Sequence, residues 1–139
     1  RSANTDDDQL TAYFFFADGD YSNNTSSAKT LGLAYDYSSM AIFESSIREF
    51  SGGPGKPSAT TLESTAIQHE FSHILGLVNN GTPTTSEHND EAHDGHCTNS
   101  GCLMYYLAET SGIASNLFGG SVPKLDANCL ADLKANGGK

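Results

Sequence analysis

Apolar and polar residues alternate in short blocks along the first half of the chain. An aromatic block at residues 10–17 ends at Asp18-Gly19-Asp20 and predicts a buried strand followed by a turn. Residues 31–35 predict a second strand, and residues 40–43 a third strand or a continuation of the second. The Gly- and Pro-rich segment 51–57 should end this region. We therefore expect a small sheet near the start of the chain.

A longer amphipathic segment follows. Thr60 and Glu63 match a capping box at a helix start. The apolar residues behind them are spaced for a helix buried on more than one side. They are Leu62, Ala66, Ile67, Phe71, Ile74 and Leu75. Gly76 tolerates the left-handed conformation in which helices commonly end. A shorter helix is expected at residues 125–134, before Asn136-Gly137-Gly138, which makes the chain an α+β protein.

Length and charge exclude several classes of protein. The chain has 139 residues, enough for one domain with a real core, and we assign residues 1–139 to it. A net charge of −10 argues against nucleic acids and anionic lipid surfaces as partners. No apolar run is long enough for a transmembrane helix, so we expect no membrane insertion. Residues 1–9 are polar and do not begin with Met, which suggests a processed chain.

The most informative motif, H-E-F-S-H-I-L-G, spans residues 69–76 of the predicted helix. Residues four apart share one face of a helix, so His69 and His73 can bind one metal ion while Glu70 lies beside it. A catalytic zinc needs three protein ligands and one open position. All five histidines of the chain lie between His69 and His96, which favours a metal site over scattered surface residues.

A second block at residues 96–104, H-C-T-N-S-G-C-L-M, completes the pattern. Together the two blocks resemble the metzincin clan of zinc peptidases, in which H-E-x-x-H-x-x-G-x-x-H/D precedes a methionine-containing turn. Asn79 stands at the third-ligand position, and neutral Asn is a poor zinc ligand. The second block resembles the archaemetzincin segment that starts with the third ligand. The resemblance therefore implies His96 as third ligand, displaced by an insertion at 79–95, with Met104 beneath the metal.

Alternatives remain within the insertion. Other candidates for the third ligand are His88, Asp90, His93 and Asp94. A gluzincin-type site would instead use Glu87 or Glu91. The acidic side chains could also bind Ca²⁺ or a second metal through their oxygens. These side chains are Glu87, Asp90, Glu91 and Asp94. We expect the insertion to form a rim of the cleft, ordered by packing or by such a cation.

The resemblance also implies a fold and an activity. The fold would be a metzincin-like domain with a small mixed sheet, an active-site helix, a Met-turn and a C-terminal helix, without the clan's usual N-terminal strands and helix. The activity would be that of a secreted or cell-surface zinc endopeptidase, in which a zinc-activated water attacks the peptide and Glu70 is the general base. Tyr106 would stabilise the reaction intermediate. The alternative is a catalytically inactive, zinc-stabilised binding module.

The substrate is expected to be a polypeptide, and the chain a monomer. An edge strand can bind an extended peptide through its backbone. The residues assigned to it are Leu31, Gly32, Leu33, Ala34 and Tyr35. Residues 107–123, with Ile113, Leu117 and Phe118, are expected to form the wall of the main specificity pocket.

Three cysteines cannot all pair within one chain. Archaemetzincins have four cysteines here for a structural zinc, so a four-cysteine site is not expected. We expect one disulfide and one leftover thiol, with Cys129 favoured as a partner, although the sequence alone does not give the connectivity among Cys97, Cys102 and Cys129. The alternative is three reduced and buried cysteines.

Overall fold

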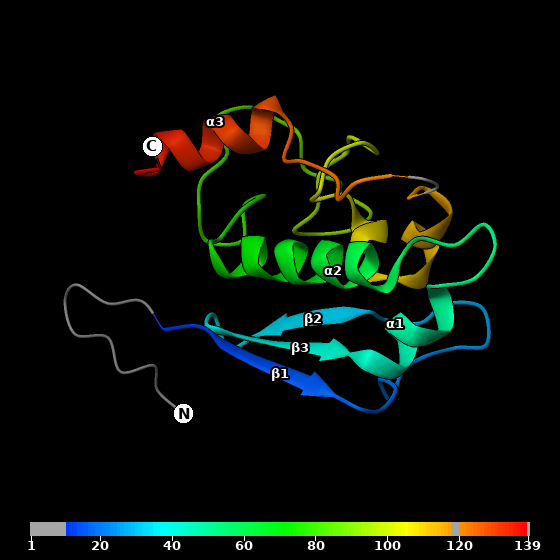
Figure 1. Cartoon of the computed structure of the whole chain (residues 1–139). Helices are drawn as coiled ribbons and strands as arrows, with labels where there is room; N and C mark the ends of the chain where they lie inside the picture. The colour runs from blue at the N-terminus through cyan, green and yellow to red at the C-terminus, as the bar shows by residue number, and fades with distance from the viewer. Residues whose placement is uncertain (1–10, 118–119, 139) are drawn as a thin grey trace.

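The structure is a computed structural model of the chain, and it describes residues 11–117 and 120–138 (Figure 1). Within these residues the sheet has three strands, β1 (Tyr13–Ala17), β2 (Gly32–Tyr35) and β3 (Ser39–Phe43). Their order is β1-β3-β2, with β3 parallel to β1 and antiparallel to β2. The described chain is thus a small mixed α+β domain, and the predicted strands at residues 31–35 and 40–43 are confirmed as a hairpin.

Three α-helices accompany the sheet in the described part of the chain. They are α1 (Glu44–Phe50), α2 (Ala59–Ile74) and α3 (Ala127–Ala135). Two 3₁₀ helices, η1 (Tyr106–Glu109) and η2 (Ser111–Ser115), lie between α2 and α3 in sequence. Helix α1 was not predicted, because it follows β3 without a turn residue and its N-cap, Phe43, has no capping side chain.

Helix α2 begins and ends at identifiable residues. Its N-cap is Ser58, whose hydroxyl oxygen accepts the Thr61 amide at 3.0 Å, so the capping box predicted at Thr60 and Glu63 is wrong. At the other end, Gly76 has a φ of +81°, as its place in the motif predicted. A Cβ atom there would lie 2.8 Å from the Thr82 hydroxyl oxygen, so glycine is also required by packing.

The main core lies between α2 and the sheet. In Figure 1, α2 lies over one face of the sheet, and α3 lies on the other side of α2. The buried apolar side chains of this core come from the strands, α1, α2 and η2. They are Leu31, Met40, Ile42, Ile47, Leu62, Ala66, Ile113, Ala114 and Leu117. Ile113 and Leu117 are therefore core residues, and the prediction that they form the wall of a pocket is wrong, while Phe118 lies outside the described residues.

Strand β1 was predicted to be buried, but in the structure it is largely exposed. Its aromatic side chains are 38% to 60% exposed within the structure. They are Tyr13, Phe14, Phe15 and Phe16. The reason is position: β1 is one of the two edge strands, and α2 packs mainly against the other edge strand, β2, and the central strand, β3. Leu10, the first residue of the predicted strand, lies outside the described residues.

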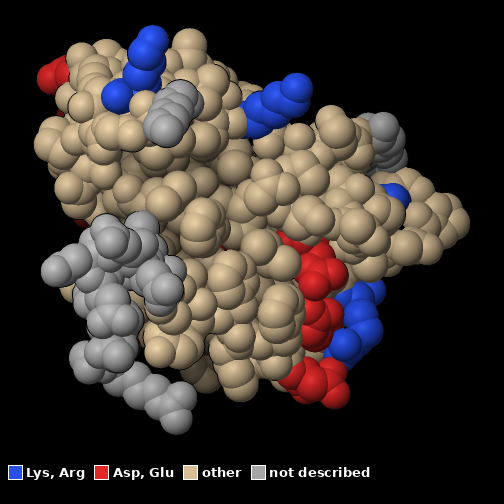
Figure 2. All heavy atoms as spheres, turned by 60° about the vertical axis from the view of Figure 1, so that its left-hand side comes forward, with Lys and Arg blue, Asp and Glu red and all other residues tan. Residues whose placement is uncertain are grey.

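The surface carries its charges unevenly. Figure 2 shows a face on which acidic side chains form one short row, while most of the visible atoms belong to uncharged residues. Some acidic side chains of the protein are paired, since Lys29 Nζ lies 3.0 Å from Asp20 and 2.6 Å from Glu49.

Within the described residues, no helix has the length and apolar character needed to cross a bilayer.

Asp132 of α3 orders the insertion at residues 79–95. This buried carboxylate accepts the amide and hydroxyl of Thr85 at 2.6 and 2.8 Å, and its other oxygen accepts His88 Nε2–H at 2.7 Å. Burial alone would raise the pKa of Asp132, but the bonds from Thr85 and His88 outweigh it and hold the pKa below its usual value. Packing against α3 therefore orders the insertion.

The acidic side chains of the insertion do not support the cation site considered for them. Glu87, Glu91 and Asp94 are exposed, and Asp90 instead accepts a hydrogen bond from His93 Nδ1 at 2.8 Å. Within the described residues, none of these four belongs to a group of side chains close enough to share a metal ion.

Replacing Asp132 should destabilise the fold. The substitution Asp132→Ala leaves the partly buried Thr85 amide and the buried His88 ring without their partner, and we expect the free energy of unfolding to fall by about 2–4 kcal/mol. Urea denaturation followed by circular dichroism measures this change. The control Glu91→Ala removes an exposed carboxylate of the same loop and should change stability by less than about 0.5 kcal/mol. Equal effects of the two substitutions would contradict the anchoring role of Asp132.

Candidate metal centre

Three histidines from two segments converge beside α2. His69 and His73 lie one turn apart on α2, and His96 comes from the end of the insertion. The ring centroids of these histidines are 4.7 Å (69–73), 5.2 Å (69–96) and 5.0 Å (73–96) apart. The Nε2 atoms of His69 and His73 are separated by only 3.0 Å. The three side chains proposed from the sequence as ligands thus face one common point.

Hydrogen bonds orient two of these rings. His69 Nδ1–H donates to the Leu103 carbonyl oxygen at 2.7 Å, which leaves the Nε2 lone pair of a neutral ring free. His96 Nδ1 lies 3.2 and 3.0 Å from the carbonyl oxygens of His93 and Asp94, and its buried Nε2 makes no hydrogen bond. Metal-binding histidines commonly donate their second ring N–H to a carbonyl in this way.

Burial keeps two of the rings neutral. It lowers the pKa of His69 well below the usual value, and the neighbouring His73 lowers it further. Burial, followed by His96, lowers the pKa of His73 to about 4. For His96, burial acts in the same direction, but Glu109 outweighs it and raises the pKa. At neutral pH, His69 and His73 therefore have the lone pairs that metal binding requires.

Glu109 is a member of the cluster that the sequence did not reveal. Its Oε2 lies 3.6 Å from His96 Nε2. A carboxylate oxygen of Glu109 and one ring nitrogen from each of the three histidines all lie within 4.8 Å of one another. It is the last residue of η1, and no motif or spacing marks it. Only the fold shows that η1 packs against α2.

Glu70 lies beside the cluster in an unusual state. The side chain is fully buried, and neither carboxylate oxygen makes a hydrogen bond within the described residues. Burial raises the pKa of Glu70 well above its usual value, Glu109 raises it further, and the nearby Ala34 amide opposes the shift. Gly32 makes room for it, since a Cβ atom there would lie 2.8 Å from Glu70 Cγ.

A cleft opens between the histidines and the edge of the sheet. A cavity of about 190 Å³ is lined by Glu70, His73, Glu109, Asn80 and the β2 residues Leu33 and Ala34. A second cavity of about 280 Å³ continues along Ala34 and Tyr35 and also touches His73. Since β2 is the outer strand on this side, its edge borders the cleft. Asn80, at the start of the insertion, lines both cavities.

Leu31 does not belong to this edge. Its side chain is buried in the core, its amide donates to the Glu109 carbonyl oxygen at 2.7 Å, and its carbonyl accepts the Phe43 amide at 2.9 Å. Its backbone therefore has no group left for a peptide, and the prediction that it binds substrate is wrong.

The remaining candidates lie elsewhere. Tyr106 stacks on His93 with ring centroids 3.6 Å apart, and neither residue is part of the histidine group. His88 is bonded to Asp132, and Asn79 is exposed with a φ of +61°. Met104 is buried in a separate core cluster, in the turn whose Leu103 carbonyl accepts the bond from His69. Glu87 and Glu91 are exposed and are not part of the histidine group. The carboxylate that joins the three histidines in the described residues is that of Glu109.

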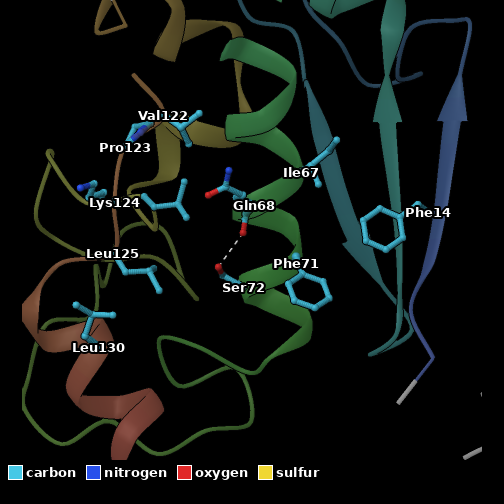
Figure 3. A pocket seen from close by; sticks show the side chains of 11 residues that line it. Phe14, Ile67, Gln68, Phe71, Ser72, Val122, Pro123, Lys124, Leu125 and Leu130 are labelled. Atoms are coloured by element: carbon cyan, nitrogen blue, oxygen red, sulfur yellow. Dashed lines mark hydrogen bonds between the residues drawn. The ribbon is translucent and has the colours of Figure 1, made fainter. Parts of the chain in front are cut away.

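A larger, apolar pocket of about 730 Å³ lies on the neighbouring face of α2 (Figure 3). Ile67, Phe71 and Ser72 line it from α2, with Phe14 of β1 and Leu130 of α3 on either side. The rings of Phe14 and Phe71 stack 6.3 Å apart. None of the clustered histidines lines this pocket, so it is separate from the candidate metal centre.

Comparison of the chain with protein-family models, with curated proteins and with solved structures found no match in any of the three. The functional argument therefore rests on the geometry of this chain, which gathers four side chains that could hold a metal ion.

Exchanging His96 should remove one bound metal ion. We expect His96→Ala to retain one Zn²⁺ per chain fewer than the unmodified protein, because the substitution takes away one of the three convergent imidazoles. Elemental analysis after dialysis against a weak chelator measures the content. The matched control is His93→Ala, three residues earlier and outside the group, which should leave the content unchanged. Loss of zinc in the control but not in His96→Ala would reverse the assignment.

Proposed function

We propose that the chain is a zinc-dependent endopeptidase of the metzincin type, with His69, His73 and His96 as metal ligands. The observation that carries the proposal is the combination of three convergent imidazoles with a fully buried, unpartnered Glu70 next to them. A metal site that only stabilises a fold does not need such a carboxylate, and burying it costs free energy. The H-E-x-x-H-x-x-G spacing and the turn at Met104 support the same clan.

The donor set suits zinc. Two nitrogen ligands at about 2.0–2.1 Å on a tetrahedral zinc are about 3.4 Å apart. The 3.0 Å between the Nε2 atoms of His69 and His73 is close to that separation. If all three histidines bound a zinc ion through neutral imidazoles, they would fill three of its four positions and leave one open, as catalytic zinc sites require. Glu109 belongs to the same group of side chains and lines the smaller cavity of the cleft.

The protein's own groups account for the proton transfers. Zinc, when bound, lowers the pKa of water and polarises the carbonyl of the scissile bond. Glu70 then accepts a proton on a carboxylate oxygen and delivers it to the nitrogen of the leaving amine. Burial raises the pKa of Glu70 well above its usual value, and a raised pKa makes a carboxylate a stronger proton acceptor. Gly32 keeps this carboxylate in place beside the cleft.

The edge of β2 supports a polypeptide substrate. An extended peptide can pair with an open strand edge, and the cavities along Leu33, Ala34 and Tyr35 adjoin Glu70 and His73. We propose that the protein acts as a monomer, secreted or at the cell surface. The second candidate function is a zinc-stabilised binding module without turnover.

The substitution Glu70→Gln should abolish cleavage and leave metal binding intact. Glutamine has the same shape but cannot accept the proton, so we expect kcat/KM on unfolded casein to fall by about 10²–10⁴-fold. Fluorescence release from labelled casein measures this, with zinc content determined for both proteins. Equal cleavage by both proteins would rule out Glu70 as the base. No cleavage by the zinc-loaded parent would favour the binding module.

The substitution Gly32→Ala should impair catalysis through Glu70. The added methyl group would come within 2.8 Å of Glu70 Cγ and 3.0 Å of its Oε1, so the carboxylate must shift. A displacement of about 1 Å at a reacting group can cost on the order of 10²-fold in rate. We expect a lower kcat at unchanged zinc content. The control Gly19→Ala, where nothing lies within 4 Å of the new Cβ, should keep full activity.

A further inference from the structure

The cleft beside the candidate metal centre continues into an outer cavity that no step of the proposed mechanism uses. This cavity has a volume of about 280 Å³. Tyr35, Asp36 and Tyr37 line it from the turn between β2 and β3, and His73 lines it from the end of α2. The smaller, inner cavity shares part of this lining and contains the buried Glu70, whose oxygens have no hydrogen-bond partner within the described residues. The two cavities therefore form one cleft with the proposed reacting centre at its inner end.

The size and lining of the outer cavity fit one long cationic side chain. Its volume is just below the roughly 300–1,000 Å³ of pockets that enclose a whole small ligand. Ala34 and Ile74 provide apolar surface for the methylene stem of a lysine or arginine. The rings of Tyr35 and Tyr37 attract a cation through their faces, and the Asp36 carboxylate can form an ion pair with it.

The charges along the cleft favour a cationic partner. Within the described residues, no lysine or arginine lines either cavity. Glu109 of the inner cavity already lies 3.6 Å from His96 Nε2, whereas Asp36 forms no ion pair in the described part of the chain. The net charge of −10 adds a long-range attraction for cationic polypeptides. Asp36 is therefore the carboxylate of the cleft whose charge is left for a substrate.

The backbone is strained in both segments that form the outer cavity. Asp36 and Tyr37 have φ values of +51° and +57°, in a turn where asparagine and glycine are the usual residues. Tyr37 is 92% exposed, so its ring contributes little to the core. On the other wall, Val78 and Asn79, with φ values of +56° and +61°, directly precede Asn80 of the lining. Such strain concentrates at functional sites, where the position of a side chain matters more than its cost.

We propose that the outer cavity binds a lysine or arginine side chain of a polypeptide substrate, with Asp36 as the ion-pair partner and the rings of Tyr35 and Tyr37 against the cation. Asp36 follows Leu33 of the inner cavity by three residues, a distance of about 10 Å along an extended chain. The cation therefore lies two or three residues from the scissile bond. Cleavage at that bond rests on the proposed peptidase function, whereas binding of the cation needs no turnover.

The three cysteines lie outside this cleft, since none of them lines either cavity. Cys97, Cys102 and Cys129 are free and buried, and the sulfurs of Cys102 and Cys129 are 3.6 Å apart. The disulfide expected from the sequence is therefore not present in the structure. A reducing agent can accordingly be used in binding experiments without breaking a bond that supports the cleft.

Peptide binding to the zinc-loaded, full-length Glu70→Gln protein tests the site without turnover. The probe is a fluorescein-labelled peptide of about ten residues with one central lysine, compared by anisotropy with the same peptide carrying glutamine. We expect the lysine peptide to bind about 5–10-fold more tightly. Adding Asp36→Asn should bring this ratio close to one. The control Glu91→Gln removes an exposed carboxylate that lines neither cavity and should leave the ratio unchanged.

Two further variants of the turn sharpen the test. Asp36→Lys should reverse the preference, so that a glutamate peptide binds more tightly than the lysine peptide. Tyr37→Gly removes the ring and relieves the backbone, so it should keep the fold by circular dichroism while lowering the affinity for the lysine peptide. Equal binding of the lysine and glutamine peptides, or a lysine preference that survives Asp36→Asn, would overturn the proposal.

The outcomes for the cavity and for the peptidase function are distinguishable. Selective binding of the lysine peptide without cleavage of casein by the unsubstituted protein would support the cation site and contradict the peptidase. Cleavage by the unsubstituted protein, together with equal binding of both peptides, would support the peptidase and contradict the cation site.

Discussion

The hydrogen bond from His69 Nδ1 to the Leu103 carbonyl oxygen joins the two parts of the chain from which the candidate metal centre is built. It fixes the tautomer of His69, so that Nε2 faces His73, and it holds the turn around Met104 against α2. The same segment carries His96 at its start, since the Cys97 amide donates to the Met104 carbonyl oxygen at 2.8 Å. This contact therefore helps to fix the position of the third histidine relative to the other two.

Several buried polar groups of the candidate metal centre do not stabilise the fold. Glu70, His73 and His96 each keep a buried polar atom without a hydrogen-bond partner, and each such atom costs on the order of 1–3 kcal/mol. The apolar core between α2 and the sheet must offset this cost. Regions of a protein that violate the rule of satisfied polar groups are commonly its functional sites. Among the described residues, Glu70, His73 and His96 bring several such atoms together beside an open strand edge.

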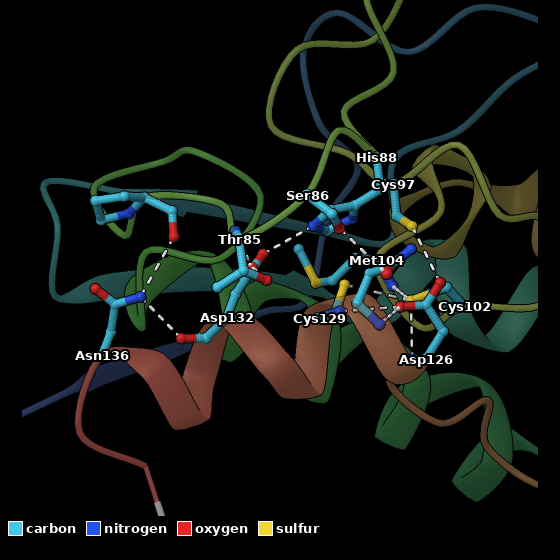
Figure 4. Close-up of polar contacts among 12 residues, drawn as sticks. Thr85, Ser86, His88, Cys97, Cys102, Met104, Asp126, Cys129, Asp132 and Asn136 are labelled. Atoms are coloured by element: carbon cyan, nitrogen blue, oxygen red, sulfur yellow. Dashed lines mark hydrogen bonds and ion pairs between the residues drawn. The ribbon is translucent and has the colours of Figure 1, made fainter.

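The insertion at residues 79–95 links α2 to the third histidine of the candidate metal centre. It leaves α2 at Gly76, lines the cleft with Asn80, is held to α3 by Asp132, and returns at His96. A loop of this length would normally loosen the residue that it carries. Here, the hydrogen bonds of Thr85 and His88 to the buried Asp132 carboxylate fix the middle of the loop (Figure 4). An antiparallel β-bridge between the backbones of Asn89 and Cys97 fixes its end. The length of the insertion is thus compatible with a rigid third histidine.

The sequence by itself determined the local features. The spacing of His69 and His73 puts both on one face of any helix, the glycine at position 76 predicts where that helix ends, and the apolar blocks at 31–35 and 40–43 predict strands. These inferences depend only on neighbouring residues, because helical and strand periodicity are local. The choice of His96 over His88 and His93 came from the resemblance to a known block, and the structure brings His96 to the other two rings.

Only the tertiary structure decided which distant residues meet. Glu109 and Gly32 carry no signal in the sequence, yet one enters the histidine group and the other makes room for Glu70. The aromatic block of β1 has the composition of a buried strand, but its place at the outside of the sheet leaves it exposed. The partners of the three cysteines likewise depended on where α3 and the insertion pack. Composition and periodicity determine which residues avoid water, whereas the packing of separate elements determines which of them are covered and by what.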